Sequence, residues 1–162
     1  MAAYYASILY GALLTVGVSL AALLVSVLLG LLGAGAKLSG NRPLVALATG
    51  YTTIIRGIPE LVLMLLVFYG GSIGINHLLE LSGTGATLDI NPFTAGVLTL
   101  GFIYGAYMTE TFRGAILAIP RGQFEAAAAF GMGPVQIFLR ITAPQMVRHA
   151  VPGFTNNWLV LI

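Results

Sequence analysis

Residues 123–144 read QFEAAAAFGMGPVQIFLRITAP, and this stretch follows three long apolar runs. Alanine favours the helix more than any other residue, so Ala126 to Ala129 predict a short helix from Gln123 to residue 130, with Glu125 in its first turn. Gly131 stands where this helix should end, because glycine adopts the left-handed C-terminal conformation at little cost. The alanines would leave this helix with a smooth face.

Two prolines organise the second half of the stretch. Pro134 is placed to open another short helix, because proline suits the first helical turn, and Pro144 is placed to end the unit. The prediction is therefore a helix–turn–helix over residues 120–145, outside the bilayer. Small side chains on its first helix would let another protein approach closely, so we interpret it as a docking element.

The pattern also resembles a known family. Glu125-Ala126-Ala127, followed by Gly131 and then Ile141-x-x-Pro144, resembles the EAA loop of ABC importer permease subunits. The leucine that usually precedes the proline is Ala143 here. The resemblance implies that this loop binds a cytoplasmic ATPase and transmits its conformational change to the permease. The residues it assigns to ATPase coupling are Glu125, Ala126, Ala127, Ala128, Gly131, Ile141 and Pro144.

Composition indicates an all-α integral membrane protein. Hydrophobic residues make up 58% of the chain and charged residues only 7%, against about 25% charged residues in an average soluble domain. The chain has no cysteine, and its two histidines, His77 and His149, lie too far apart in sequence to suggest a metal site. We expect no catalytic residues and no metal ligands in it.

Charge-free apolar runs predict the membrane spans. At 1.5 Å per residue, about 20 residues cross a bilayer. Spans are expected at about 8–36, 60–76 and 90–111, with the start of a further span at 153–162. Because that last run is too short to cross, we expect the chain to be truncated at its C-terminus.

Small residues recur at helical spacing within two of these spans. Gly11, Thr15, Ser19 and Ala22 follow one another at three- and four-residue steps, and Gly101-x-x-x-Gly105 lies in the third span. Small side chains let helix backbones approach in membranes. We therefore expect both sets to pack against neighbouring helices.

The segment Arg56-Gly57-Ile58-Pro59-Glu60 predicts a helix break. It follows a short apolar helix expected over 44–55, near the interface, and its arginine and glutamate are expected to mark the water boundary. A plain Arg–Glu pair at a helix start would explain the charges but not the glycine and proline. With its surroundings, YTTIIRGIPELVLMLLVFYG, the segment resembles the polar amino-acid branch of the same permease family, in which Arg56, Gly57 and Pro59 would introduce the second core helix.

Glu110 and Arg113 are one helical turn apart near the end of the third span and can form an ion pair. The run GFIYGAYMTETFRGAI around them resembles the same branch. Ionisable residues near membrane depth are candidates for the substrate path, but a structural pair that holds the coupling loop to the core is the favoured interpretation. Tyr104 and Tyr107 suit either a substrate path or an anchoring role near the interface.

Charge placement predicts the orientation. All seven Lys and Arg residues lie between the first two spans or after the third span. The polar loop expected over 77–91, which carries Glu80 and Asp89, has none. The positive-inside rule then places the N-terminus outside and the 120–145 loop in the cytoplasm, where an ATPase would dock.

Taken together, the resemblance implies a MetI-like helix bundle of the bacterial inner membrane that serves as a permease subunit of an ATP-driven amino-acid importer. The closest pattern is that of importers for histidine, lysine, arginine and ornithine, or for opines. The implied partners are a cytoplasmic ABC ATPase, a second permease subunit, identical or different, and an extracytoplasmic amino-acid binding protein. ATP and magnesium would be bound by the ATPase, and neither a cofactor in this chain nor a nucleic-acid partner is expected.

Other functions remain as alternatives. A secondary transporter or channel subunit would share the hydropathy, but it would not need a cytoplasmic EAA-type loop and would more often carry polar groups at mid-span. An intramembrane enzyme would need a nucleophile–base or metal constellation, which the residues do not supply. A membrane scaffold would show no transport defect on deletion.

Overall fold

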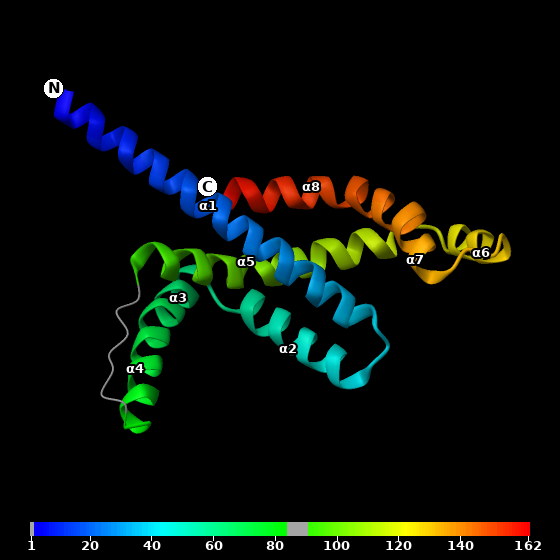
Figure 1. The fold of residues 1–162 in the computed structure, drawn as a ribbon, viewed down its shortest axis with the longest axis horizontal. Helices are drawn as coiled ribbons and strands as arrows, with labels where there is room; N and C mark the ends of the chain where they lie inside the picture. Colours follow the sequence, from blue (N-terminus) through cyan, green and yellow to red (C-terminus); the bar gives the residue numbers. More distant parts are fainter. Residues whose placement is uncertain (1, 84–90) are drawn as a thin grey trace.

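The computed structural model describes residues 2–83 and 91–162, and these residues form helices joined by short connections, without a strand (Figure 1). The helices, in chain order, are α1 (Ala2–Leu38), α2 (Arg42–Gly57), α3 (Glu60–Leu65), the π-helical turn η1 (Leu66–Gly70), α4 (Gly71–Leu81), α5 (Pro92–Leu117), α6 (Arg121–Ala129), α7 (Pro134–Ile137), the π-helical turn η2 (Phe138–Thr142) and α8 (Ala143–Leu161). The predicted all-α fold is confirmed.

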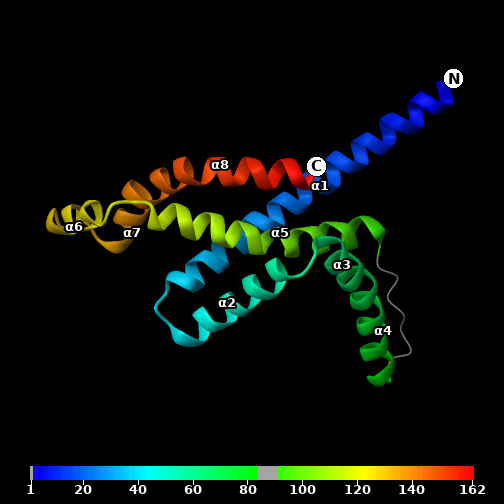
Figure 2. The ribbon, with the colours of Figure 1, turned by 180° about the vertical axis from the view of Figure 1, so that it is seen from behind.

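Helix α5 is the centre of the bundle. Seen from the front and from behind, it lies between α8 and α2, while α1 crosses it diagonally (Figures 1 and 2). Its buried side chains, among them Ile103, Met108 and Phe112, form the two apolar cores with residues of α1, α2, α3 and α8. Helices α6 and α7 lie beyond the C-terminal end of α5, outside this core.

Glycines allow α1 and α5 to approach closely. A Cβ atom added at Gly101 of α5 would lie 2.6 Å from the Cβ atom of Val25, and one added at Gly105 would lie 2.8 Å from the Cβ atom of Leu29. Both distances are too short for real carbon contacts, so only glycine fits. The predicted Gly101-x-x-x-Gly105 packing face is confirmed.

The small-residue set predicted on α1 is only partly correct. Ser19 and Ala22 are buried, but Gly11 and Thr15 are exposed, because the N-terminal part of α1 extends beyond the bundle (Figure 1). Contact with α5 instead continues toward the C-terminus of α1, where a Cβ atom at Gly33 would meet the side chain of Thr109 at 2.3 Å.

The predicted helix break after α2 is confirmed. Helix α2 ends at Gly57, Ile58 is extended with φ −109° and ψ 139°, and α3 begins at Glu60 directly after Pro59. Proline lacks the N–H that would continue α2, and its ring holds the preceding residue in an extended conformation.

The helix that follows is longer than the predicted span 60–76. Helix α3, η1 and α4 follow one another without a gap as far as Leu81. His77 and Glu80, which we expected in a loop, therefore lie in the last turns of α4, with 4.0 Å between Nδ1 of His77 and Oε2 of Glu80. Residues 84–90 of the predicted loop, which include Asp89, lie outside the described residues.

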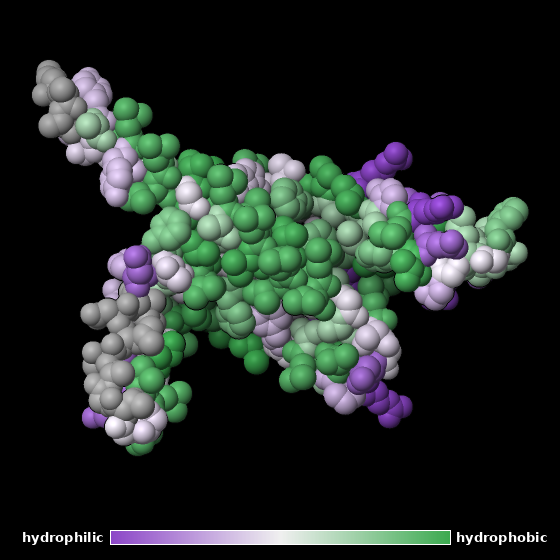
Figure 3. Space-filling view, viewed as in Figure 1, coloured by the Kyte–Doolittle hydropathy of each residue, from purple (hydrophilic) through white to green (hydrophobic). Residues whose placement is uncertain are grey.

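Two helical stretches of the described chain are long and apolar enough to cross a membrane, Tyr4–Leu38 and Glu60–Leu81. Helix α5, the third predicted span, has 26 residues but a more polar sequence, with threonine, glycine and tyrosine on its packed faces. Apolar side chains cover the middle of the molecular surface, whereas strongly hydrophilic ones gather beside α7 and the start of α8 and at the start of α2 (Figure 3). Such a surface suits contact with lipid around the bundle.

Candidate coupling loop and polar clusters of the bundle

Helix α6 begins at Arg121, directly after Pro120, and ends at Ala129. Glu125 therefore lies in the second turn of this helix, so its predicted place in the first turn is wrong. The reason is that the helix begins at Arg121, directly after Pro120 and two residues before Gln123. Proline at the boundary has no N–H to leave unpaired, which favours an early start.

Gly131 ends the helix as predicted. Its φ angle is +75°, and its N–H donates to the carbonyl of Ala128 at 2.9 Å, while the N–H of Met132 donates to the carbonyl of Ala127 at 3.1 Å. These two bonds form a Schellman motif, which satisfies carbonyls at the end of the helix and turns the chain sharply. The exit direction of α6 thus depends on a conformation that other residues rarely adopt.

The surface of α6 is small-sided and ends in one large apolar side chain. Ala126 and Ala128 are exposed, whereas Ala127 is only 5% exposed. Phe130, at the end of the helix, is 87% exposed. The exposed Phe130 ring and the exposed alanines form an apolar patch on the surface of α6. Exposed apolar patches often mark sites of protein–protein contact.

Beyond the turn, Pro134 opens α7 as predicted, with Gly133 before it. The prediction that Pro144 ends the unit is wrong, since α7, η2 and α8 follow one another without a gap and Pro144 lies in the first turn of α8. The π turn directly before Pro144 widens the backbone hydrogen-bond spacing, which accommodates the missing N–H. The half-buried side chain of Ile141 belongs to this π turn.

The apolar helix expected to begin at 153 begins much earlier. Helix α8 runs from Ala143 to Leu161 and continues through Pro152, which is exposed on its surface. A proline inside a helix removes one hydrogen bond without always ending the helix.

A pair of glutamines joins α6 to α8. The Nε2 atom of Gln145 donates to the Oε1 atom of Gln123 and also to the carbonyl of Ile141, the latter at 3.1 Å. This side chain therefore contacts the first turn of α6 and the π turn together. Sequence analysis missed the pair, because two isolated glutamines carry no pattern that would connect them.

The predicted ion pair of α5 is confirmed and forms part of a larger cluster. Nε of Arg113 lies 2.9 Å from Oε2 of Glu110, and Nζ of Lys37 donates to Oε1 of the same carboxylate. Lys37 also donates to Oγ1 of Thr52 at 2.7 Å. The Lys37 and Glu110 side chains are only 10% and 17% exposed. We call these four residues the three-helix cluster, because they come from α1, α2 and α5.

Sequence analysis missed the part that Lys37 plays. The predicted first span, 8–36, stops directly before Lys37, so the prediction gives this lysine no partner. Lys37 is the first charged residue after a long uncharged segment, and this position is a signal in the sequence. A charged side chain near the membrane interior usually has a polar or charged partner. The partner's identity, however, depends on how α1 crosses α5.

Arg56 and Glu60, which we expected to mark the water boundary, lie beside the middle of α5, and Glu60 is the first residue of the apolar stretch Glu60–Leu81. Oε1 of Glu60 accepts a hydrogen bond of 2.6 Å from the hydroxyl of Tyr104, and the Arg56 guanidinium carbon lies 5.5 Å from the centre of the Tyr107 ring. In the described chain the two residues form no ion pair with each other. Helix α2 packs along α5, which places the break next to α5, with Arg56 exposed and Glu60 half-buried.

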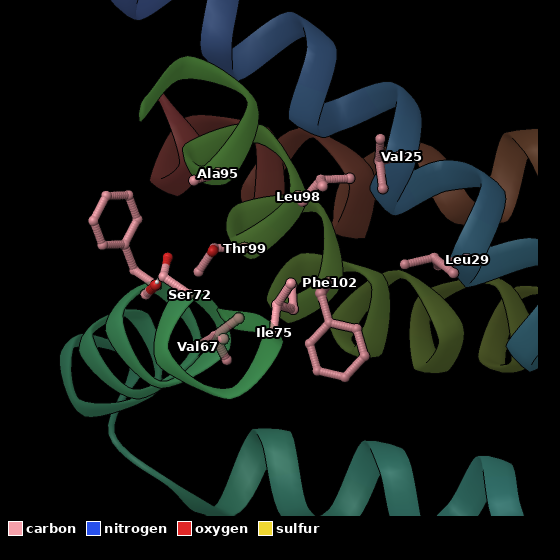
Figure 4. Close-up of a pocket in the computed structure, with 11 residues that line it drawn as sticks. Val25, Leu29, Val67, Ser72, Ile75, Ala95, Leu98, Thr99 and Phe102 are labelled. Atoms are coloured by element: carbon pink, nitrogen blue, oxygen red, sulfur yellow. Dashed lines mark hydrogen bonds between the residues drawn. The ribbon is translucent and has the colours of Figure 1, made fainter. Parts of the chain in front are cut away.

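A pocket between α1, η1–α4 and α5 is apolar throughout (Figure 4). Its lining includes Val25, Leu29, Val67, Ile75, Ala95, Leu98 and Phe102, with only the hydroxyls of Ser72 and Thr99 as polar groups. Among the described residues, no titratable side chain lines it. A zwitterionic or charged solute would find no counter-charge there, so the polar clusters are the better candidates for solute recognition.

The chain matches the family model of the binding-protein-dependent transport system inner membrane component over residues 26–162. This match covers the three-helix cluster, the helix break and the whole coupling loop.

Curated relatives are similar over nearly the whole chain. The histidine/lysine/arginine/ornithine transport system permease protein HisQ of Escherichia coli is 54% identical over 96% of this chain and 68% of its own length. The octopine transport system permease protein OccQ of Rhizobium radiobacter is 39% identical over 92% of this chain and 63% of its own length. The arginine ABC transporter permease protein ArtQ of Haemophilus influenzae is 40% identical over 93% of this chain and 65% of its own length.

A solved structure has the same fold. A crystal structure of an amino acid ABC transporter with histidines matches with a TM-score of 0.71 and 31% identity, over 97% of this chain and 71% of that chain. The helix arrangement and the sequence thus point to one family. The chain belongs to the family of binding-protein-dependent transport system inner membrane components, and within it to the permeases of the polar amino-acid branch of ABC transporters.

Proposed function

We propose that this chain is the permease subunit through which an ATP-driven importer moves basic amino acids across the inner membrane. The observation that carries the substrate class is the 54% identity to a permease of a histidine/lysine/arginine/ornithine transport system, which extends over 96% of the chain. The similarity to an arginine transporter permease points the same way.

The coupling loop is proposed to dock on a cytoplasmic ABC ATPase. Helix α6 offers the exposed methyl groups of Ala126 and Ala128 and the exposed ring of Phe130, and it projects beyond the end of α5 (Figure 1). ATP and magnesium would be bound by that ATPase, so ATP hydrolysis is assigned to the partner. A second permease subunit and an extracytoplasmic amino-acid binding protein would complete the transporter.

The proposed orientation rests on the charges at the two ends of the bundle. Arg121, Arg140 and Arg148 lie on α6, η2 and α8, and Arg42 opens α2 at the same end of the molecule (Figure 1). Under the positive-inside rule this end faces the cytoplasm and the N-terminus of α1 lies outside. A thiol-labelling scan of single cysteines from each side of the membrane would test the orientation.

In the proposed mechanism, closure of the ATPase pair moves α6, and the helices attached to it carry this motion into the bundle. Gln145 links α6 to α8, and the three-helix cluster holds α1 and α2 against α5. Both connections are short-range and polar, so the coupling loop and the core can move as one body. Under this proposal the Glu110–Arg113 pair is structural, and the path alternates between outward and inward access as ATP shifts the two states.

Uptake measurements in the native cell test the function. Deletion of the chain should abolish uptake of labelled arginine, histidine and lysine, and uptake by the intact cell should follow ATP rather than the ion gradient. Uptake that continues when ATP is depleted but the ion gradient is kept would favour a secondary transporter or channel. Normal uptake without the chain would contradict a transport function.

A further inference from the structure

A second apolar cavity lies between α1, α5 and α8, in the part of the bundle nearer to the coupling loop. Its volume is about 330 Å³. Its lining includes Val27, Leu31, Phe112, Met146, Val147 and Val151. The side chains of Val147 and Val151 are also exposed on the outside of α8, so this cavity is a groove in the surface of the bundle. We call it the α1–α8 groove.

The groove lies near the level at which the uncharged part of α1 ends. Met146 and Ala150 of α8 belong to the same core cluster as Ala34 of α1. Ala34 is three residues before Lys37, the first charge after the long uncharged run. In a membrane, the hydrocarbon layer meets the lipid headgroups where such a run ends. Helix α8 therefore enters the hydrocarbon layer near Arg148, which lies between Met146 and Ala150 in the sequence.

Two arginines stand beside this level without an acidic partner. Arg140 of η2 and Arg148 of α8 are exposed, and neither belongs to an ion pair within the described ranges. From Ala126 to Ile162 the sequence contains no Asp or Glu. Figure 3 shows strongly hydrophilic side chains gathered beside α7 and the start of α8. The positive charge of these two arginines is therefore left for a group from outside this segment to balance.

The arginines and the groove lie along one side of a continuous helix. Val147 and Val151 follow Arg140 by seven and eleven residues, which correspond to about two and three helical turns, and η2 runs into α8 without a gap. Arg148 directly follows Val147. A molecule with its apolar end between these valines and α1 would have both guanidinium groups within reach of its other end.

We propose that the α1–α8 groove binds an anionic phospholipid, with part of an acyl chain in the groove and the phosphate at Arg148 and Arg140. At about 30 Å³ for a water-sized group, the groove has room for about 11 such groups. This suits a stretch of acyl chain better than a helix of a partner protein, which is about 10–12 Å wide. The guanidinium group matches phosphate in geometry, and basic pockets between membrane helices bind anionic headgroups. The proposal concerns a lipid of the membrane and does not depend on which solute is transported.

Photolabelling of the purified complete transporter tests the site. The transporter would be placed in phosphatidylcholine nanodiscs that contain phosphatidylglycerol with a photoactivatable diazirine in its acyl chain, and the adducts would be located by mass spectrometry of peptides. We expect adducts in residues 27–31 of α1 and 146–154 of α8. Unlabelled phosphatidylglycerol should displace the probe, and additional phosphatidylcholine should not.

Variants of the two arginines separate the headgroup contact from general surface charge. Arg148→Gln and Arg140→Gln should each raise the mole fraction of phosphatidylglycerol needed for half-maximal labelling about 5-fold, and the double variant should raise it about 25-fold. Arg148→Lys keeps the charge and should retain most of the preference. Arg42→Gln is the matched control, because Arg42 is exposed at the start of α2 and removes one positive charge from the same end of the molecule. It should label as the native protein does.

A variant of the groove tests the acyl-chain contact with both arginines in place. Val151→Trp puts a large side chain into the groove, so labelling of residues 146–154 and 27–31 should be lost. Arg140 and Arg148 have no ion-pair partner within the described ranges, so their glutamine variants should melt at the native temperature in phosphatidylcholine.

Three results would overturn the inference, and each leaves the proposed function in place. One is a phosphatidylcholine probe that labels the groove as strongly as the phosphatidylglycerol probe. Another is unchanged labelling in the double variant. The third is a groove that gives no lipid adduct and is covered by another subunit of the transporter, which a crosslink from a cysteine at Val147 would show.

Discussion

Nε2 of Gln145 on α8 donates to Oε1 of Gln123 on α6, and the same nitrogen donates to the carbonyl of Ile141 in the π turn between α7 and α8. One side chain therefore joins the helix proposed to contact the ATPase to the helix that packs along α5. If a movement of α6 is transmitted to the bundle, we expect the hydrogen bond between these two glutamines to be one of the contacts that transmits it.

Replacement of Gln145 by alanine should weaken coupling rather than docking. Each lost hydrogen bond contributes about 0.5–1.5 kcal/mol to stability. We expect amino-acid uptake to fall several-fold while the ATPase subunit still copurifies. Gln123→Ala should have a smaller effect, because Gln145 then keeps its bond to the Ile141 carbonyl. The double variant should be no worse than Gln145→Ala, because Gln145→Ala already removes the bond between the two glutamines. Additive losses would show that the two glutamines act separately.

Gly131→Ala should misdirect the end of α6. The left-handed backbone at φ +75° costs a residue with a Cβ atom about 1–2 kcal/mol. Uptake and copurification of the ATPase should both fall, and Gly131→Asp should abolish uptake with membrane insertion intact. Gly122→Ala in the same helix is the matched control, since a Cβ there meets nothing within 4 Å and alanine favours the helix. Equal uptake by the two alanine variants would contradict the role assigned to Gly131.

Lys37→Met should destabilise the bundle. It leaves Glu110 with Arg113 alone and removes the bond to Thr52. Breaking a buried ion pair lowers the free energy of unfolding by about 3–5 kcal/mol. Because Arg113 still pairs with Glu110 in this variant, we expect a loss of about half that size. The melting temperature of the detergent-solubilised protein would report the loss. Arg42→Met is the control at the same end, because Arg42 is exposed and forms no ion pair within the described ranges. A similar melting temperature for both variants would exclude the cluster as a stabilising element.

Gly101→Ala should disturb the contact between α1 and α5. The added Cβ would stand 2.6 Å from Val25, and overpacking of this kind costs about 1–3 kcal/mol. Lower yield of folded protein after detergent extraction is the expected result. Gly11→Ala lies on the exposed part of α1 with nothing within 4 Å, and should be neutral. A neutral Gly101→Ala would mean that α1 shifts freely along α5.

Local signals in the sequence predicted local structure well. Proline and glycine located the break after Gly57, the end of α6 at Gly131 and the start of α7 at Pro134, because each acts through backbone constraints within a few residues. The same reasoning failed at Pro144 and Pro152, where a helix continues through both. A neighbouring π turn accommodates the first of these prolines, and residue propensities do not reveal such a turn.

Partners across helices were harder to predict. The Glu110–Arg113 pair was found because its members are one turn apart on one helix. Lys37, Thr52 and the Glu60–Tyr104 bond depend on the crossing of α1, α2 and α5, so they have no signature in sequence spacing. The same holds for the contact of Arg56 with Tyr107, because it depends on how α2 packs along α5.

The most direct test of the account is a crosslink from the coupling helix. The chain has no cysteine, so a single cysteine at Ala128, exposed on α6, gives one labelling site. A photoactivatable thiol reagent in native membranes, with the adduct identified by mass spectrometry, should capture an ABC ATPase with a yield that changes when nucleotide is added. Cysteine at Leu13, 71% exposed on the outer part of α1, should give no such adduct. No ATPase adduct from Ala128, together with labelling of that site from outside the cell, would contradict both the orientation and the coupling function.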